Sequence, residues 1–110
     1  MSDTAIITAL GALAQTHRLA AFRVLVQAGP VGIAAGALAD MLGLQPSALS
    51  FHLAQLVGAG LIAGRRDGRH LLYTADFGAM TTLVDYLTEN CCGGVPCAVE
   101  TNIQRTLSRT

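Results

Sequence analysis

Apolar residues recur at helical spacing in five stretches of the chain, and glycine, proline or capping residues separate these stretches. This spacing places apolar side chains on one face of an α-helix, where they can pack into a core. We predict helices over residues 4–14, 16–28, 33–42 and 46–58, and a last helix that starts after Asp76 and includes the first two cysteines. The residues expected to face inward are Leu19, Phe22, Leu25, Val26, Leu38, Met41, Leu42, Leu49, Leu53, Leu56 and Val57. The first helix carries an apolar stripe of Ile6, Ala9, Leu10 and Leu13, and the last helix carries one of Phe77, Met80, Leu83, Val84 and Leu87.

Residues with strong preferences for helix ends mark the boundaries of these helices. Thr16 is expected to cap the second helix and Asp76 the last, because their side-chain oxygens can accept backbone N–H bonds. Pro46 suits the first turn of the fourth helix, and Gly43 suits the end of the third. The turn of about four residues between the third and fourth helices, with its glycine, is the signature of a helix-turn-helix.

Two strand-like runs, residues 61–66 and 69–74, flank Asp67-Gly68. This dipeptide indicates a hairpin with a type I′ turn, which needs positive φ at both central residues. The predicted fold is therefore mainly α with a β-hairpin wing: a winged helix-turn-helix with an additional helix at each end. Because the central helices and the wing already form a core, we expect the apolar stripes of the terminal helices to serve dimerisation.

The composition fits one small domain, expected over residues 1–97, followed by a weakly ordered tail over residues 98–110. The chain is 52% hydrophobic and only 13% charged, so a second copy of the chain is expected to cover part of the apolar surface. The net charge is zero, which argues against a general polyanion binder. It does not exclude DNA binding, because Arg65, Arg66 and Arg69 gather at the wing.

The sequence predicts a cytoplasmic protein with no membrane partner. The start of the chain has no basic segment of the secretory type, and no uncharged apolar run reaches transmembrane length. All three cysteines lie between residues 91 and 97, whereas a disulfide framework spaces its cysteines widely.

The second helix of a helix-turn-helix enters the DNA major groove, and the residues near its N-terminus meet the base edges. Gln can pair with adenine, Ser with several base edges, and Ala or Phe can touch a thymine methyl group. The wing arginines suit phosphates or the minor groove. The candidate DNA-binding residues are Gln45, Ser47, Ala48, Ser50, Phe51, His52, Gln55, Arg65, Arg66 and Arg69.

Each of these residues also has a simpler interpretation. The polar side chains and the three arginines could be ordinary solvated surface. Ser50 is expected nearer the buried edge of the helix, where it would serve packing or a phosphate. His52 could equally pack or form a hydrogen bond at the helix edge.

Residues 44–53 (LQPSALSFHL), Leu56, residues 60–62 (GLI) and residues 65–69 (RRDGR) closely resemble the ArsR/SmtB family of arsenic- and metal-responsive bacterial repressors. The shared pattern is S-x-x-S-x-H-L in the recognition helix and R-x-G-R in the wing, and the resemblance covers roughly residues 10–90. It implies a homodimer with the terminal helices at its interface. It also implies a transcriptional repressor that binds double-stranded operator DNA and is released by a toxic ion.

Two ion sites known in this family have no counterpart here. Residues 30–35 contain no cysteine where some members carry a C-x-C box. The last helix has Asp85 and Glu89 but no histidine, so the Asp, His and Glu site of other members is missing too.

The remaining candidate ligands are Cys91, Cys92 and Cys97. Thiolates bind soft ions, and three thiolates suit pyramidal As(III) or Sb(III), whereas structural zinc takes four ligands. Some members of the family are similar in having a three-cysteine arsenite site at this end of the last helix. We predict As(III) as the inducer, with Sb(III) or a trivalent methylarsenical as further candidates and no organic cofactor. A redox switch, another soft ion such as copper(I) or cadmium, and incidental thiols are the alternatives.

An enzyme is not expected. A cysteine-based arsenate reductase needs an oxyanion-binding loop and an activated thiolate on a rigid scaffold. The thiols here follow the last helix, and no arginine lies between Cys91 and Cys97. A pure interaction module would not need the three wing arginines, and a DNA binder that ignores ions would not need the cysteines.

Overall fold

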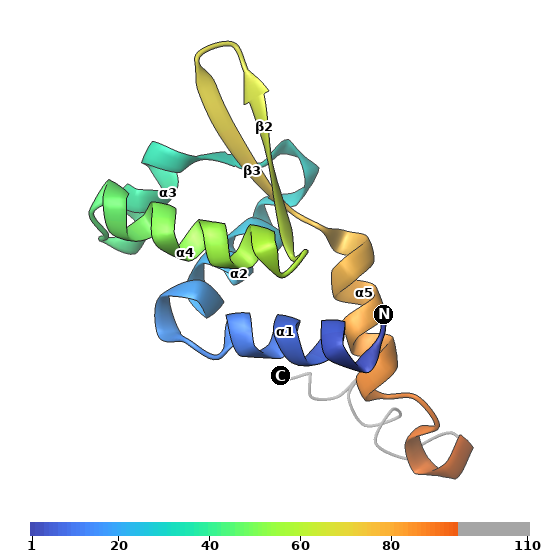
Figure 1. The fold of residues 1–110 in the computed structure, drawn as a ribbon. Helices are drawn as coiled ribbons and strands as arrows, with labels where there is room; N and C mark the ends of the chain where they lie inside the picture. The colour runs from blue at the N-terminus through green and yellow to red at the C-terminus, as the bar shows by residue number, and fades with distance from the viewer. Residues whose placement is uncertain (95–110) are drawn as a thin grey trace, which may run out of the picture.

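The computed structural model describes residues 1–94, so residues 95–110, including Cys97 and the expected tail, lie outside the described part. Within the described part, an antiparallel hairpin wing projects from a group of helices (Figure 1). The elements are α1 (Asp3–Leu13), α2 (Thr16–Ala28), η1 (Gly29–Val31), β1 (Ile33–Ala34), α3 (Ala35–Leu42), α4 (Pro46–Gly58), β2 (Ile62–Asp67), β3 (His70–Ala75), α5 (Phe77–Leu87) and η2 (Cys91–Gly94). This order confirms the predicted winged helix-turn-helix with an additional helix at each end.

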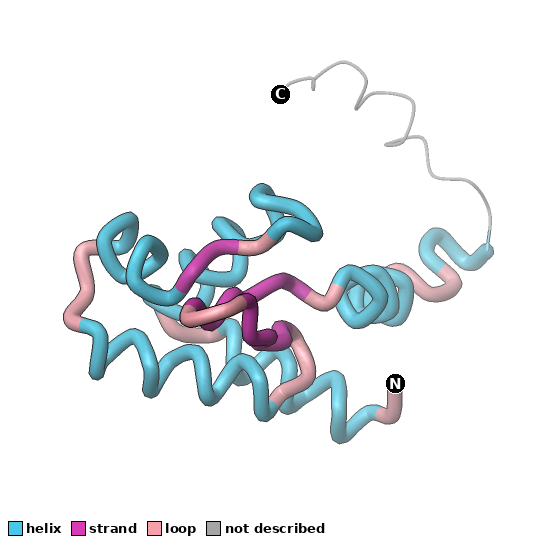
Figure 2. Tube along the Cα trace, turned by 90° about the horizontal axis from the view of Figure 1, so that it is seen from above, coloured by secondary structure: helices cyan, strands magenta, loops and turns pink. Residues whose placement is uncertain are grey.

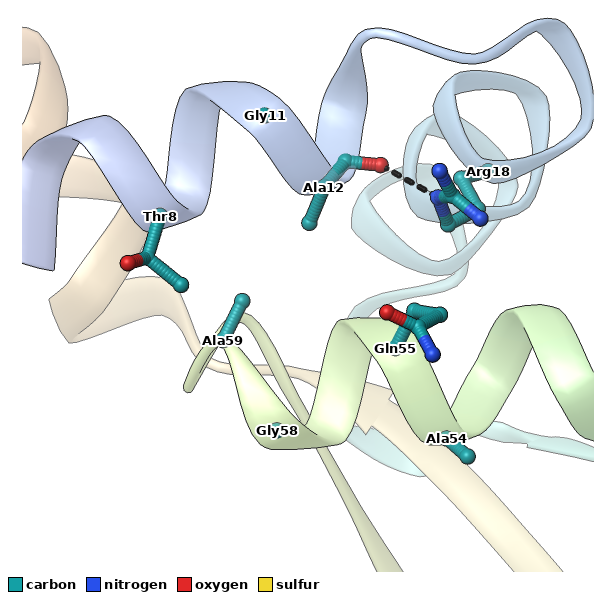
Figure 3. A pocket seen from close by; sticks show the side chains of 8 residues that line it. All are labelled: Thr8, Gly11, Ala12, Arg18, Ala54, Gln55, Gly58 and Ala59. Atoms are coloured by element: carbon teal, nitrogen blue, oxygen red, sulfur yellow. Dashed lines mark hydrogen bonds between the residues drawn. The ribbon is translucent and has the colours of Figure 1, made fainter.

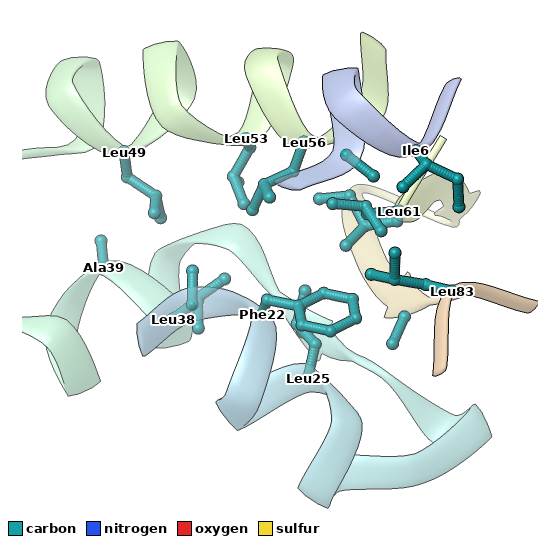
Figure 4. Packing of buried hydrophobic residues seen from close by; sticks show 14 residues of the cluster. Ile6, Phe22, Leu25, Leu38, Ala39, Leu49, Leu53, Leu56, Leu61 and Leu83 are labelled. Carbon is teal, nitrogen blue, oxygen red and sulfur yellow. The ribbon is translucent and has the colours of Figure 1, made fainter. Parts of the chain in front are cut away.

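The core lies between α2, α3 and α4 and the base of the wing (Figure 4). Ile6 of α1 and Leu83 of α5 are buried against the same cluster, so both terminal helices are attached to it. Burial of each large aliphatic side chain stabilises the fold by roughly 1.5–3 kcal/mol. The largest fully buried side chains are Leu25, Leu38, Leu49, Leu53, Leu56 and Leu61.

Three residues predicted to face inward are exposed instead: Leu19, Met41 and Val57. Alanines take part of the inward face, and Ala9, Ala21 and Ala39 are buried. The spacing of apolar residues therefore predicted the helices correctly, but it predicted more buried side chains on α2, α3 and α4 than the structure has.

The helix ends follow the predicted chemistry at three of four positions, and Pro46 lies in the first turn of α4 as expected. Asp76 caps α5 by accepting a hydrogen bond from the Ala79 N–H at 2.9 Å, and Gly43 ends α3 in the left-handed conformation. The cap of α2 is Gln15 rather than the predicted Thr16. The Gln15 side chain accepts from the Arg18 N–H at 2.9 Å, so the hydroxyl one residue later is not needed for this role.

The sheet has the strand order β1-β3-β2, and both pairings are antiparallel. Asp67 pairs with His70, so the two central residues of the turn are Gly68 and Arg69. Only Gly68 has a positive φ, of 64°, which is the pattern of a type II′ turn. The predicted type I′ turn centred on Asp67-Gly68 is therefore wrong, because Asp67 belongs to the strand ladder.

The third predicted helix begins two residues late, at Ala35, because Ile33 and Ala34 form β1. Gly32 precedes this strand with a φ of 80°, and a Cβ at this position would lie 2.7 Å from both the Tyr73 carbonyl oxygen and Thr74 Cγ2. Only glycine fits both the backbone conformation and the close approach to β3.

The start of α1 lies beside α5 in both ribbon views (Figures 1 and 2). The Tyr86 hydroxyl donates a hydrogen bond to Oδ1 of Asp3, which joins the two terminal helices directly. None of the helices in the described part of the chain is long and apolar enough to cross a membrane.

Candidate nucleic-acid interface

The N-terminal half of α4 presents most of the predicted base-reading residues to solvent. Gln45, Ser47, Ser50 and Phe51 are exposed, and Ala48 is half-buried. Leu49 and Leu53 take the inward face of this helix, so the expectation that Ser50 sits nearer the buried edge is wrong. Phe51 is 60% exposed, which leaves it able to touch an apolar group on a partner.

His52 lies at the contact between α4 and the start of α2. Its Nδ1 is 3.4 Å from Arg18 Nη1, and its ring centroid is 5.5 Å from that of His17. Burial, the positive charge of Arg18 and the neighbouring His17 together lower the pKa of His52 below its ordinary value of 6.5. Because a guanidinium can only donate, Nδ1 accepts and the imidazole is neutral at pH 7. Of the two interpretations from the sequence, this contact favours a hydrogen bond at the helix edge.

Gln55 faces a groove between α1 and α4 rather than the N-terminal end of α4 (Figure 3). The groove has a volume of about 490 Å³, and Arg18 enters it from α2. Arg18 Nε donates to the Ala12 carbonyl oxygen at 2.8 Å. No role was predicted for Arg18 from the sequence, because only the packing of three helices brings it to this place.

The three wing arginines have different surroundings. Arg65 Nη2 donates to the Val31 carbonyl oxygen at 3.2 Å, which links β2 to η1. Arg66 and Arg69 are exposed, and neither has a hydrogen-bond or ion-pair partner within residues 1–94. The charge available for an external anion on the wing is therefore carried mainly by Arg66 and Arg69.

The terminal helices expose several large apolar side chains. On α1, Ile7 is 69% and Leu10 is 40% exposed, while Val84 and Leu87 of α5 are 52% and 58% exposed. The Tyr86 hydroxyl between these helices is bound to Asp3, and this carboxylate raises the pKa of Tyr86 above 10.0. The neighbouring positions form an apolar surface that the single chain leaves uncovered.

The first two cysteines follow α5 instead of lying in it. The helix ends at Leu87, and Thr88 Oγ1 donates back to the Val84 carbonyl oxygen at 2.8 Å. Asn90 and Cys92 then adopt positive φ values of 58° and 56°, which are incompatible with a continuing helix. The prediction that Cys91 and Cys92 end the helix is wrong, because the chain turns before it reaches them.

The described part of the thiol segment brings two sulfurs together. Cys91 Sγ lies 3.6 Å from Cys92 Sγ, and Cys92 is disulfide-bonded in this structure. Both residues are exposed, and Asp85 and Glu89 are exposed as well. No group of three potential metal ligands occurs within residues 1–94, and the third predicted ligand, Cys97, lies outside them.

Residues 13–65 match the family model described as "Helix-turn-helix domain". The chain is 35% identical over 80 residues to the nodulation protein NolR of Rhizobium meliloti, an alignment that covers 73% of this chain and 63% of NolR. The chain spans less than two thirds of the length of the curated relatives it matches.

Two solved structures extend this similarity to three dimensions. NolR from Sinorhizobium fredii superposes with a TM-score of 0.63 at 32% identity, covering 80% of this chain and 85% of NolR. Mb0332 from Mycobacterium bovis gives a TM-score of 0.63 at 26% identity, covering 82% and 89% of the two chains. Mb0332 is described as a homodimeric winged helix-turn-helix DNA-binding domain of a possible ArsR-family transcriptional regulator.

Proposed function

The chain belongs to the helix-turn-helix domain family, and from this premise we propose that it is a homodimeric transcriptional repressor that binds double-stranded operator DNA. The observation that carries the proposal is the exposed N-terminal half of α4 together with the charges of Arg66 and Arg69 on the wing, which have no partner within residues 1–94. The related Mb0332 of Mycobacterium bovis is itself described as a homodimeric DNA-binding domain.

In this proposal α4 is the recognition helix and lies in the major groove. Gln45 and Ser47 offer hydrogen bonds to base edges, and Ala48 and Phe51 offer apolar contacts to thymine methyl groups. Ser50, His52 and Gln55 then contact phosphates at the margin of the interface between α4 and the DNA. Arg66 and Arg69 neutralise phosphates, which contributes affinity without sequence preference. Arg65 holds the wing against η1 through its hydrogen bond to the Val31 carbonyl oxygen, and contact with DNA is its second role.

The second copy of the chain is expected on the exposed apolar faces of α1 and α5. A twofold dimer places two copies of α4 about one helical turn of DNA apart, so the operator should be an inverted repeat.

We further propose that As(III), or Sb(III) or a trivalent methylarsenical, releases the repressor by binding Cys91, Cys92 and Cys97. Two observations support this proposal: the chain has no cysteines outside this segment, and the segment directly follows α5. An ion that gathers the thiolates would restrain the end of α5 at the expected dimer interface. For release, the ion must bind the DNA-incompetent form more tightly than the DNA-bound form.

A titration with arsenite tests this function. The protein, reduced with a phosphine, first selects binding sites from a random pool of duplexes, and fluorescence anisotropy then gives the operator affinity. Arsenite is expected to weaken operator binding by roughly 5- to 150-fold, the range of typical allosteric coupling. The variants Cys91→Ser, Cys92→Ser and Cys97→Ser should bind the operator normally and lose this response.

Two control variants separate the parts of the proposal. Glu89→Gln changes an exposed residue beside the cysteines and should leave the arsenite response intact. Arg66→Gln should weaken binding to all duplexes and reduce its salt dependence. Normal release of the serine variants by arsenite would rule out the thiol site, and failure of the reduced protein to select any duplex would rule out DNA binding.

A repressor that senses oxidation instead of arsenic is the second candidate. The 3.6 Å separation of the Cys91 and Cys92 sulfurs, together with the disulfide at Cys92, favours it. Hydrogen peroxide would convert two thiols into a disulfide and be reduced to water. In this case peroxide, and not arsenite added under reducing conditions, releases the operator, and the phosphine restores binding.

A further inference from the structure

The groove between α1 and α4 lies apart from the thiol segment and shares only Gln55 with the proposed DNA-reading residues. One wall comes from Thr8, Gly11 and Ala12 of α1, and the opposite wall comes from α4 and the residue after it (Figure 3). Its volume of about 490 Å³ falls within the range of small-molecule sites, which run from roughly 300 to 1,000 Å³.

Arg18 gives this groove a positive charge. Its side chain is half-buried, and its guanidinium donates to the Ala12 carbonyl oxygen and contacts His52. No acidic residue lines the groove, and within residues 1–94 no carboxylate forms an ion pair with Arg18. A partly desolvated cation without a counter-ion favours an anionic ligand.

The rest of the lining limits the size and polarity of such a ligand. Gly11, Gly58 and Ala59 leave a shallow surface of small residues, and a Cβ added at either glycine would meet no atom within 4 Å. Gln55 supplies an amide beside Arg18, and Thr8 lies at the far end of the groove.

We propose that this groove binds a small organic carboxylate, with its head on Arg18 and Gln55 and its apolar body against Gly11 and Gly58. A planar carboxylate matches the fork of N–H donors on a guanidinium better than a spherical ion does. The bound molecule touches both α1 and α4, so it couples the expected dimer face to the recognition helix. This site is independent of the cysteines.

The test uses benzoate as the probe and benzamide as its neutral counterpart. Backbone amide shifts of Gly11, Gly58 and Ala59 in two-dimensional NMR should saturate with benzoate, with a dissociation constant of at most about 10 mM. The same shifts should barely change with benzamide. Benzoate should also raise the pKa of His52, because it offsets the charge of Arg18 that holds this pKa down.

Gly58→Leu fills the groove without changing Arg18 and should abolish saturation. Gly36→Leu is the matched control, since Gly36 lies on α3 in open space outside the groove, and it should bind benzoate like the parent protein. Equal shifts with benzamide, unchanged binding in Gly58→Leu, or saturation by inorganic phosphate but not benzoate would overturn the proposal. The Cys91→Ser variant should bind benzoate normally, so failure of the arsenic proposal leaves this result unaffected.

Discussion

At the scale of single residues, the exposed face of α4 was predictable because helix geometry alone assigns positions to its sides. Ser47 and Phe51 are exposed as predicted, and Leu49, Leu53 and Leu56 are buried. The partners of individual side chains were not predictable in this way. The contacts of Arg18 with Ala12 and His52, and of Arg65 with Val31, join residues from different elements, and no local pattern in the sequence records them.

The depressed pKa of His52 makes stability depend on pH. In the unfolded chain the imidazole takes up a proton near pH 6.5, whereas in the folded protein it does so only at lower pH. Stability is therefore fully retained above about pH 6.5 and should fall as the pH drops through the folded-state pKa of His52. Urea unfolding at several pH values measures this loss.

The control is His52→Gln, which keeps a hydrogen-bond acceptor but does not titrate in this range. The difference in unfolding free energy between parent and variant should change with pH only below about 6.5. A difference that stays constant from pH 7.5 to pH 5 would show that His52 is not held neutral by its contacts with Arg18 and His17.

At the scale of elements, the sequence predicted the helices and the wing hairpin well because each carries its own period and end signals. It missed β1, since a strand of two residues has no period, and its partner Tyr73 is far away in the sequence. It also extended the last helix too far, because the apolar pattern does not reveal the positive φ values of Asn90 and Cys92.

The junction before β1 gives a prediction at this scale. Gly32→Ala forces a positive φ on a residue with a Cβ and brings that atom to 2.7 Å from the Tyr73 carbonyl oxygen. We expect a loss of about 1–3 kcal/mol in unfolding free energy, seen as a lower urea midpoint with an unchanged slope. Gly36→Ala, in open space on α3, should instead be neutral or stabilise the protein by up to about 1 kcal/mol. Equal midpoints for the two variants would contradict this account of Gly32.

At the scale of the whole molecule, the winged helix-turn-helix followed from the order of the predicted elements. The groove between α1 and α4 did not, because it depends on how two helices far apart in sequence lie against each other. The apolar stripes of α1 and α5 were expected to serve dimerisation, and their members Leu10, Val84 and Leu87 are exposed on the single chain. This exposure agrees with that expectation.

If α1 and α5 form the dimer interface, a charge there should separate the protomers. Leu87→Glu and Val84→Glu place a carboxylate in the apolar surface and should yield a monomer in sedimentation experiments, because an unpaired charge is costly to bury. Met41→Glu is the matched control, since Met41 is 60% exposed on α3, and it should remain dimeric. Circular dichroism checks that all three variants fold. Dimeric Leu87→Glu and Val84→Glu variants would place the interface elsewhere.

The hydrogen bond between Tyr86 and Asp3 spans 83 positions in the sequence, which affects the order of events during synthesis. The ribosome releases α1 first, yet the start of this helix can be fastened to α5 only after Tyr86 has left the exit tunnel. Central elements can pack before that moment, because their contacts lie within the chain already made. If α1 and α5 form the proposed dimer interface, a nascent chain holds an incomplete assembly surface until translation is nearly finished, and pairing between neighbouring chains on one messenger is delayed to the same stage.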